Sequence, residues 1–245
     1  GPALARPAGR DQTTVLGLNQ ALIIGSSNYE DGTTNGGCVR IVDLRRQAAG
    51  ESILGPVAST GPLAMADVNG DGQLDLLLGG RVVPGRYPEP ATSMLLRKEA
   101  ERFVVAQRFE KLGLVSGAVF SDLDGDGAPE LILACEWGPI RVLRLKEGQY
   151  VPWRLPLRWA TEGPAGGKQA QPGTLDELTG WWAGVAAGDL DGDGRLDLVA
   201  SNWGLNSRYR PLAEQPVRIH FGDFSGAGGV DVIESYFNPA DGREV

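Results

Sequence analysis

A nine-residue pattern, Asp-x-Asp/Asn-x-Asp-Gly-x-x-Asp/Glu, occurs three times in this sequence and constrains its folding more than any other feature. The copies span residues 67–75, 122–130 and 189–197, and each is followed directly by a short aliphatic run. The glycine at position six can take a positive φ, which bends the chain so that the oxygen-bearing side chains converge. The pattern therefore predicts a tight loop rich in carboxylates.

Converging carboxylates repel one another unless a cation neutralises them. A ligand set of oxygens without thiolate or imidazole favours Ca²⁺ over zinc or copper. In each loop we predict side-chain ligands at positions one, three, five and nine and a backbone carbonyl ligand at position seven. The predicted ligands are Asp67, Asn69, Asp71, Gln73, Asp75, Asp122, Asp124, Asp126, Ala128, Glu130, Asp189, Asp191, Asp193, Arg195 and Asp197. The alternative, an Asp-Gly turn held only by side-chain to backbone hydrogen bonds, does not account for three such matches.

The flanking residues distinguish these loops from an EF-hand, whose loop has about twelve positions, ends in Glu and lies between helices. Here the last acidic residue stands at position nine. The runs on either side, such as residues 118–120 and 131–134, are apolar and of strand length. The repeated unit is therefore a strand, a metal loop and a second strand.

Glycine content and repeat spacing predict the architecture. The 36 glycines and 16 prolines are typical of an all-β chain made of short strands. The spacing of the loops leaves room for a four-stranded unit, and propeller blades recur at roughly 40 to 50 residues. We predict a β-propeller of four-stranded blades, with about four blades present as an incomplete arc of a larger propeller. Such an arc would leave two apolar blade faces exposed.

The predicted strands fall into four blades, and residues 1–10 are expected to be an N-terminal tail or tag remnant. Residues 11–245 would form the blades and be truncated at the C-terminus. Three blades carry the acidic loop, and an earlier, degenerate blade lacks it. The predicted strands are 14–17, 22–25 and 39–44; 63–66, 75–79, 93–97 and 102–106; 117–121, 131–136, 140–146 and 150–154; and 182–187, 198–202, 217–221 and 232–236.

The loop between the first two strands of each blade resembles the FG-GAP/VCBS repeat of integrin-α-type propellers. Longer phrases at residues 59–90, 135–144 and 180–209 resemble bacterial FG-GAP-like repeat proteins related to cartilage acidic protein, which often carry an ASPIC/UnbV domain. The resemblance covers roughly residues 16–245. It implies a secreted or envelope-associated calcium-binding propeller with a much longer full-length form, and it names no defined biochemical activity.

A fourth loop, residues 223–231, departs from the pattern because Ser225 and Ala227 replace the carboxylates at positions three and five. It is expected to lie between later strands of the last blade. Either it is a weakened metal site or it is a glycine-rich β-turn.

Aromatic residues allow two interpretations. Tryptophans stand at positions 137, 153, 159, 181, 182 and 203. They could form a sugar-stacking platform, but packing between blades, with indole N–H groups bonded to carbonyls, is the interpretation we favour. Trp137 and Trp203, each following the second strand of a blade, are the best surface candidates. The polar run at Asn202, Asn206, Ser207, Arg208 and Tyr209 is either a structural connector or a ligand site.

Catalysis has little support in the sequence. His220, the single histidine, alternates with Ile219 and Phe221 on a predicted strand, and no nucleophile elbow, His-Glu-x-x-His pair or phosphate-binding glycine loop occurs. We therefore expect a non-enzymatic scaffold for a protein or glycan partner. The alternative is a carbohydrate-active module, a polysaccharide lyase or lectin-like domain, on a propeller.

Charge and hydropathy exclude other classes. The net charge is −8, and the three acidic loops hold eleven of the 31 acidic residues. This distribution provides no basic surface for nucleic acid. No run approaches the roughly 18 apolar residues of a membrane span, and an extracellular or cell-envelope location follows from the resemblance. Cys38 and Cys135 would either pair in an oxidising compartment or remain as free buried thiols.

Overall fold

The computed structural model describes residues 9–29, 38–46, 48–100, 102–157, 173–204, 206–207, 209 and 215–245. Within these residues the secondary structure is strand except for the short 3-10 helix η2 (Leu175–Glu177). The strands are β1 (Gln12–Leu18), β2 (Ala21–Ser26), β3 (Cys38–Asp43), β4 (Ala48–Leu54), β5 (Ser59–Ala66), β6 (Asp75–Val82), β7 (Ala91–Glu99), β8 (Arg102–Ser121), β9 (Glu130–Glu136), β10 (Ile140–Lys146), β11 (Gln149–Pro152), β12 (Trp182–Gly188), β13 (Asp197–Asn202), β14 (Arg218–Gly222), β15 (Asp231–Ser235), β16 (Phe237–Asn238) and β17 (Arg243–Glu244). The predicted all-β class is confirmed, and no helix in the described residues is long and apolar enough to cross a bilayer.

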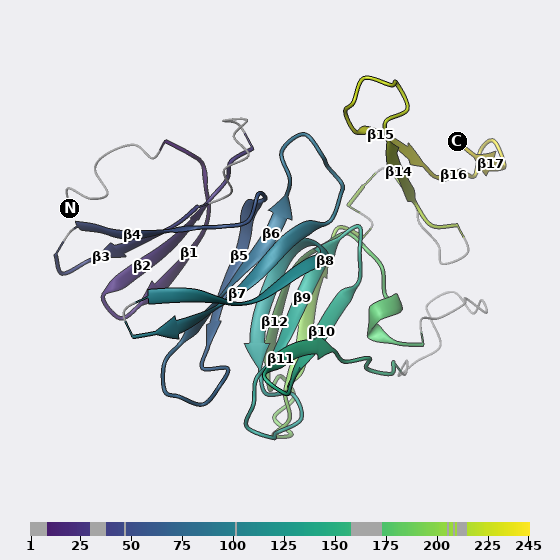
Figure 1. Cartoon of the computed structure of the whole chain (residues 1–245). Coiled ribbons are helices and arrows are strands. Elements are labelled where there is room, and N and C mark those ends of the chain that lie inside the picture. The colour runs from purple at the N-terminus through teal and green to yellow at the C-terminus, as the bar shows by residue number, and fades with distance from the viewer. Residues whose placement is uncertain are drawn as a thin grey trace.

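The strands form antiparallel meanders that follow one another along the chain (Figure 1). One sheet has the order β1-β2-β3-β4, and a seven-stranded sheet has the order β11-β10-β9-β8-β7-β6-β5. Strand β8 belongs to two meanders, because residues 102–113 pair with β7 and residues 114–121 pair with β9. The change of partner falls at Gly113, whose φ of 118° is open to glycine and strained for other residues.

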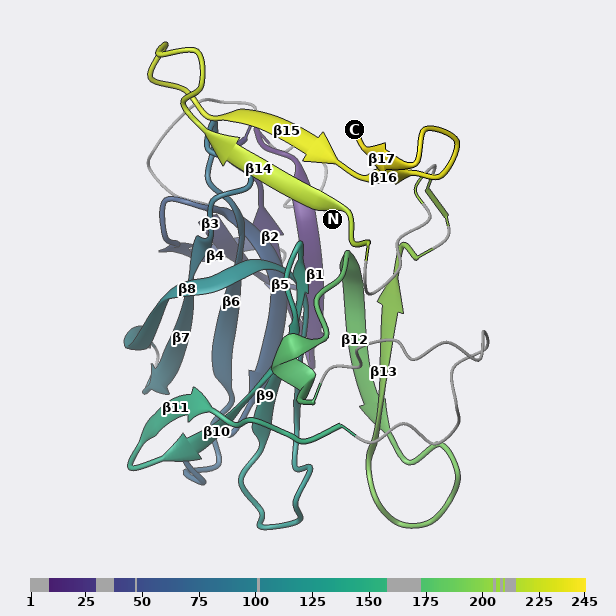
Figure 2. The same ribbon diagram turned by 90° about the vertical axis from the view of Figure 1, so that its right-hand side faces the viewer.

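Four sheet units follow from this pairing. Unit 1 is β1 to β4, unit 2 is β5 to the first part of β8, unit 3 is the second part of β8 to β11, and unit 4 is the β12–β13 hairpin. The β14–β15 and β16–β17 hairpins form separate two-stranded sheets. The view in Figure 2, turned by a quarter from Figure 1, shows β14 and β15 lying across one end of the strands of the other units.

Alternation of side chains explains why the units stack face to face. In β6, Leu76 and Leu78 pack with Ile23 and Val39 of unit 1, while Leu77 points to the opposite face. In β9 the same alternation sends Leu131 and Leu133 toward unit 2 and Ile132 toward unit 4. Successive side chains of a strand lie on opposite faces, so a strand with both faces buried becomes apolar throughout.

Two glycines allow the first strands of adjacent units to approach closely. A Cβ atom at Gly61 of β5 would lie 2.7 Å from the carbonyl oxygen of Val115, and one at Gly117 of β8 would lie 2.7 Å from the Cα atom of Gly184. Beside the second contact, the Ser116 hydroxyl lies 2.6 Å from the carbonyl oxygen of Trp182. Units 2, 3 and 4 are therefore packed backbone to backbone along these strands.

Most predicted strands of units 2 and 3 are confirmed, and three expectations need correction. The degenerate unit has a fourth strand, β4, which the prediction omitted. The predicted strands 102–106 and 117–121 are parts of the single strand β8. The predicted blade containing 182–187, 198–202, 217–221 and 232–236 is wrong as a single sheet, because β12–β13 and β14–β15 pair separately. No closed propeller is present among the described residues.

Apolar side chains remain exposed on the outermost elements. Val15 and Leu54 of unit 1 are exposed, as are Val199 of unit 4 and Ile233 of β15. The surface of an open arc is expected to retain such side chains, because each sheet unit is covered only by its neighbours.

Replacing Gly117 by alanine should disrupt the packing of β12 against β8, because the new Cβ atom meets backbone that cannot rotate away. We expect the free energy of unfolding, measured by urea denaturation, to fall by about 1–3 kcal/mol. Gly188→Ala in β12 is the matched control, since a Cβ atom there has no neighbour within 4 Å. Equal effects of the two substitutions would contradict the close-packing interpretation.

Candidate metal centres

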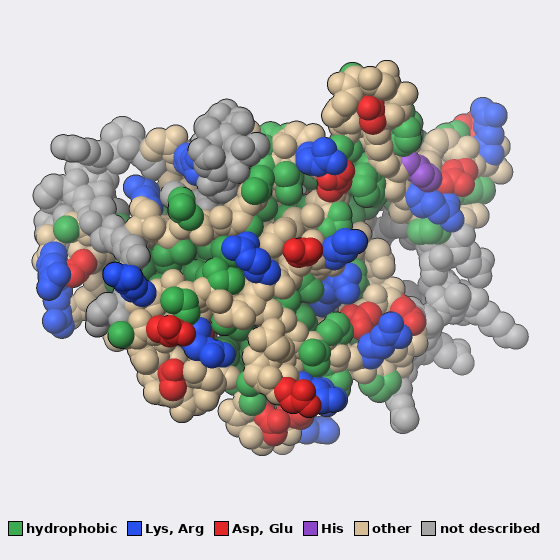
Figure 3. Space-filling model, viewed as in Figure 1, with side chains coloured by type: hydrophobic (Ala, Val, Ile, Leu, Met, Phe, Trp, Pro, Cys, Tyr) green, Lys and Arg blue, Asp and Glu red, His purple; other side chains and the backbone are tan. Residues whose placement is uncertain are grey.

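The three acidic loops all lie at the same end of the sheet units. They connect the first and second strands of successive hairpins, β5 to β6, β8 to β9 and β12 to β13. This end is the lower edge in Figures 1 and 2. The space-filling view has Asp and Glu side chains along that edge (Figure 3).

Each loop is shaped by hydrogen bonds to the carboxylate at position one. In the second loop, Asp122 Oδ1 accepts a hydrogen bond from the backbone N–H of Gly125 at 2.8 Å, and Oδ2 accepts one from Gly127 at 3.0 Å. Asp67 and Asp189 make the corresponding pairs of bonds in the other two loops. Positions four and six both have positive φ, 77° at Gly125 and 90° at Gly127. The glycine at position four was the part of the signal that the sequence analysis did not use.

The acidic residue at position nine connects each loop to the following strand. Glu130 Oε2 accepts a hydrogen bond from the N–H of Leu123 at 2.8 Å, and Asp75 and Asp197 accept from the equivalent position two. The side chains of Glu130 and Asp75 are buried, with 2% and 0% exposed. Burial raises the pKa of both carboxyl groups. A cation beside such a group would favour its charged form.

Two of the loops bring three acidic side chains together. Oxygen atoms of Asp122, Asp124 and Glu130 all lie within 4.8 Å of one another, and so do oxygen atoms of Asp189, Asp191 and Asp197. Both sets are hard oxygen donors, and a metal ion such as Ca²⁺ fits them. The position-five residue is outside each group.

The first loop differs from the other two because Asn69 occupies position three. Its amide Nδ2 donates a hydrogen bond to Asp71 Oδ2 at 2.8 Å, and this bond is the main cause of the lowered pKa of Asp71. Within the described residues the loop does not gather three acidic groups. Metal binding by residues 67–75, and the carbonyl ligands at Gln73, Ala128 and Arg195, stay predictions.

In the third loop an arginine engages the position-five carboxylate. Arg195 Nη2 and Nε lie 2.6 Å and 2.9 Å from Asp193 Oδ2. The hydrogen bond from the Arg195 side chain is the largest contribution to the lowered pKa of Asp193. The guanidinium group therefore occupies an oxygen that the prediction assigns to the metal.

The fourth loop, residues 223–231, keeps part of the same backbone shape without the acids at positions three and five. It connects β14 to β15, at the opposite end of the molecule from the other three loops (Figure 1). Gly228 N donates to Asp223 Oδ2 at 3.0 Å, and Ser225 N donates to Asp231 Oδ2 at 2.8 Å. The bond from Gly228 to Asp223 is the same as in the three acidic loops, so it does not decide between a weakened metal site and a glycine-rich turn.

The remaining predicted residues have varied environments. The imidazole Nε2 of His220 lies 3.1 Å from the Ser235 hydroxyl on the paired strand. Cys135 is a buried free thiol, and burial raises its pKa to about 11. The side chain of Cys38 and residues Trp159 and Arg208 lie outside the described residues.

The tryptophans divide into two groups. Trp153 and Trp182 pack with Ile132 and Val142 between units 3 and 4, as the packing interpretation expects. Trp137, Trp181 and Trp203 instead form a stack at the surface, which the sequence analysis did not foresee as a group.

Comparison with known families supports the assignment of the acidic repeat. Residues 122–200 match the family model of the FG-GAP-like repeat, a segment that includes the second and third acidic loops. No curated protein matches the chain significantly. The FG-GAP resemblance is confirmed over this segment, whereas the finer relation to cartilage acidic protein has no support in the match.

Replacing Arg195 by alanine should strengthen calcium binding in the third loop, because it removes a positive charge and releases Asp193. We expect the dissociation constant of that site, measured by calorimetric titration, to fall about threefold. Arg46→Ala removes a comparable exposed charge outside the loops and should have no effect. If Arg195→Ala leaves the calcium affinity unchanged, Arg195 does not weaken the site. If the affinity rises equally when Asp191→Ala is also present, the calcium is not bound by the third loop.

Proposed function

We propose that the chain is a calcium-binding arc of FG-GAP-type β-propeller blades that serves as a scaffold for a protein or glycan partner. The observation that carries the proposal is the recurrence of one acidic loop, with two acidic clusters, inside a segment that matches the FG-GAP-like repeat. The proposed location is the cell surface or the extracellular space, where calcium is abundant enough to fill sites of modest affinity.

The stacking of the sheet units supports the blade assignment. Units 1 to 3 are four-stranded meanders, and the last strand of unit 2 continues directly as the first strand of unit 3. Separate apolar clusters lie between units 1 and 2, units 2 and 3, and units 3 and 4. Contact of each unit only with its neighbours is the arrangement of propeller blades. In this proposal residues 11–245 are blades of a larger propeller.

Calcium would act on the stability of the units. The position-nine acids, Asp75 and Glu130, are the first residues of the buried strands β6 and β9. A cation held by these loops would therefore fasten the first two strands of a unit at one end. A ligand that binds only the folded state stabilises it by mass action.

A scaffold also fits the chemistry of the side chains better than an enzyme does. The clustered acids serve as cation ligands in this proposal, and His220 is engaged with Ser235 on a strand. The second candidate, a lectin-like module, is favoured by one observation: three tryptophans stack beside a surface pocket.

Chelation should lower the melting temperature of the chain. For one site with a dissociation constant of about 10⁻⁴ M, about 1 mM Ca²⁺ would contribute roughly 1.4 kcal/mol. We expect scanning calorimetry to show a higher melting temperature in calcium than in chelator, and Asp191→Ala to lose much of this difference.

The matched control is Glu110→Ala, which removes an exposed carboxylate from β8 outside the acidic loops. It should retain the full response to calcium. Superimposable melting curves of the original chain in calcium and in chelator would refute the role of the loops as structural metal sites.

A further inference from the structure

A pocket of about 240 Å³ lies at the end of the strands opposite the acidic loops. Strands β9 and β13 both begin at the last residue of an acidic loop. Strand β9 ends at Glu136 and β13 ends at Asn202. The next residue in each case, Trp137 and Trp203, lines the pocket. Six or seven strand residues separate the two ends, a length of roughly 20 Å. The pocket and the acidic loops are thus separate surfaces of the same sheets.

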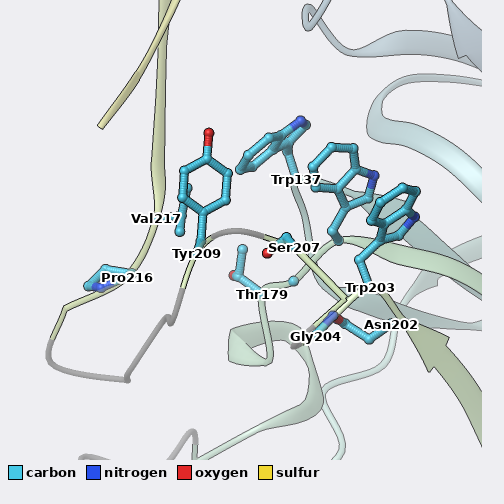
Figure 4. A pocket seen from close by; sticks show the side chains of 11 residues that line it. Trp137, Thr179, Asn202, Trp203, Gly204, Ser207, Tyr209, Pro216 and Val217 are labelled. Atoms are coloured by element: carbon cyan, nitrogen blue, oxygen red, sulfur yellow. The ribbon is translucent and has the colours of Figure 1, made fainter. Parts of the chain in front are cut away.

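Three tryptophans form a continuous stack along this pocket. The ring centroids of Trp137 and Trp181 are 5.0 Å apart at an interplanar angle of 31°, and those of Trp181 and Trp203 are 5.1 Å apart at 20°. Trp203, at one end of the stack, is 48% exposed. In the view of Figure 4, Tyr209 lies on one side of the pocket and Trp203 on the other, with Thr179 and Ser207 between them and Asn202 below Trp203.

Backbone and side-chain bonds hold the stack in place. Gly180 and Gly138 exchange backbone hydrogen bonds of 2.9 Å and 3.3 Å, and the N–H of Trp203 donates to the carbonyl of Trp181 at 3.1 Å. The indole N–H of Trp137 donates to the Tyr87 hydroxyl at 2.6 Å, which in turn donates to Glu136 at 2.7 Å.

This chain of bonds ends in an ion pair whose carboxylate is buried and whose arginine is partly exposed. Glu136 is 5% exposed and is paired with Arg81 of β6. Trp137 itself has φ of 52°, a left-handed conformation that is rare for an aromatic residue. A strained residue that neighbouring bonds hold in position is typical of a preorganised binding site.

Polar groups lie beside the aromatic face. Asn202 Oδ1 accepts a hydrogen bond from the N–H of Gly204 at 2.7 Å, an arrangement that orients the amide. Within the described part of the chain, the Asn202 Nδ2 atom and the Thr179 hydroxyl make no hydrogen bond. Both residues line the pocket, so donors for a ligand stand next to the exposed indole.

We infer that this pocket binds a pyranose ring of an oligosaccharide. A pyranose has an apolar face of C–H groups, which packs on an indole, and hydroxyl groups at its rim, which need hydrogen-bond partners. Indoles stacked on one another leave an open ring only at the end of the stack, at Trp203, whereas a cage for a quaternary ammonium group surrounds the cation with aromatic faces. A nucleobase would also stack, but its phosphates would meet a chain of net charge −8.

The inference rests on the proposed scaffold function and specifies the glycan alternative within it. The first experiment applies the labelled chain, in calcium, to immobilised oligosaccharides of glucose, galactose, mannose, xylose and their uronic acids, with oligothymidylate on the same surface. We expect binding to at least one oligosaccharide. Failure of every oligosaccharide, or binding of oligothymidylate alone, overturns the inference.

The second experiment titrates the best-binding oligosaccharide against variants by calorimetry. Trp203→Ala should weaken binding at least about tenfold, because it removes the exposed stacking face. Trp203→Phe should retain most of the affinity, and Thr179→Val should lose a few-fold. Phe224→Ala, which removes an exposed aromatic ring outside the pocket, is the matched control and should bind as the original chain does. Full affinity in Trp203→Ala would mean that the glycan binds elsewhere and would overturn the assignment.

The two proposals fail separately. If the melting curves do not change with calcium but glycan binding depends on Trp203, the calcium scaffold is refuted and the sugar site is supported. If the melting temperature depends on calcium but no glycan binds, the sugar site is refuted and the calcium scaffold is supported. The Trp203→Ala chain should still melt cooperatively, since Trp203 lies outside the apolar clusters that join the units.

Discussion

The burial of both faces of the second strand in units 2 and 3 is the constraint on which the rest of the structure depends. Leu76 and Leu78 contact one neighbouring unit and Leu77 contacts the other, and all three are almost fully buried. At about 25 cal/mol per Å² of buried apolar surface, an uncovered face of this kind would cost several kcal/mol. Units 2 and 3 therefore each depend on their neighbours for stability. The stack fixes the relative positions of the loops at one end and of the tryptophans at the other.

The acidic loops are joined to this core through one side chain each. Glu130 begins β9 and is buried with Leu131 behind it, while its carboxylate bonds back to Leu123 at the start of the loop. The hydrogen bonds to Asp122 and Asp189 give the backbone its shape, and the degenerate loop at 223–231 keeps some of them. A loop can therefore keep this backbone shape even when it has lost carboxylates, as the loop at 223–231 has. What distinguishes the loops at 122–130 and 189–197 is the extra negative charge that their acids at position three bring to the cluster.

Sequence reasoning could locate the acidic loops and most strands of units 2 and 3 because those signals are local. Ligand spacing, glycine positions and short aliphatic runs all lie within about ten residues of one another. Strand β4, with the sequence AAGESIL, lacks both an adjacent acidic loop and a clear apolar run. The predicted strands 102–106 and 117–121 leave out the residues around Gly113, whose positive φ redirects β8 without ending it. Strands β12–β13 and β14–β15 each pair as a hairpin, and the sequence has no local signal for the missing pairing between β13 and β14.

The tryptophan stack was hidden for the same reason. Trp137 follows β9, Trp181 precedes β12 and Trp203 follows β13, so the three indoles meet only when units 3 and 4 pack together. A buried acid, Glu136, holds the Tyr87 hydroxyl against the first indole, and this link reaches across to unit 2. Burying the carboxylate of Glu136 is costly unless it is paired, and the partly exposed Arg81 supplies the partner. Packing between sheet units needs no such network, because Trp153 and Trp182 pack within the apolar cluster of units 3 and 4. The polar support around the stack therefore favours a surface that recognises a ligand over one that only fills space.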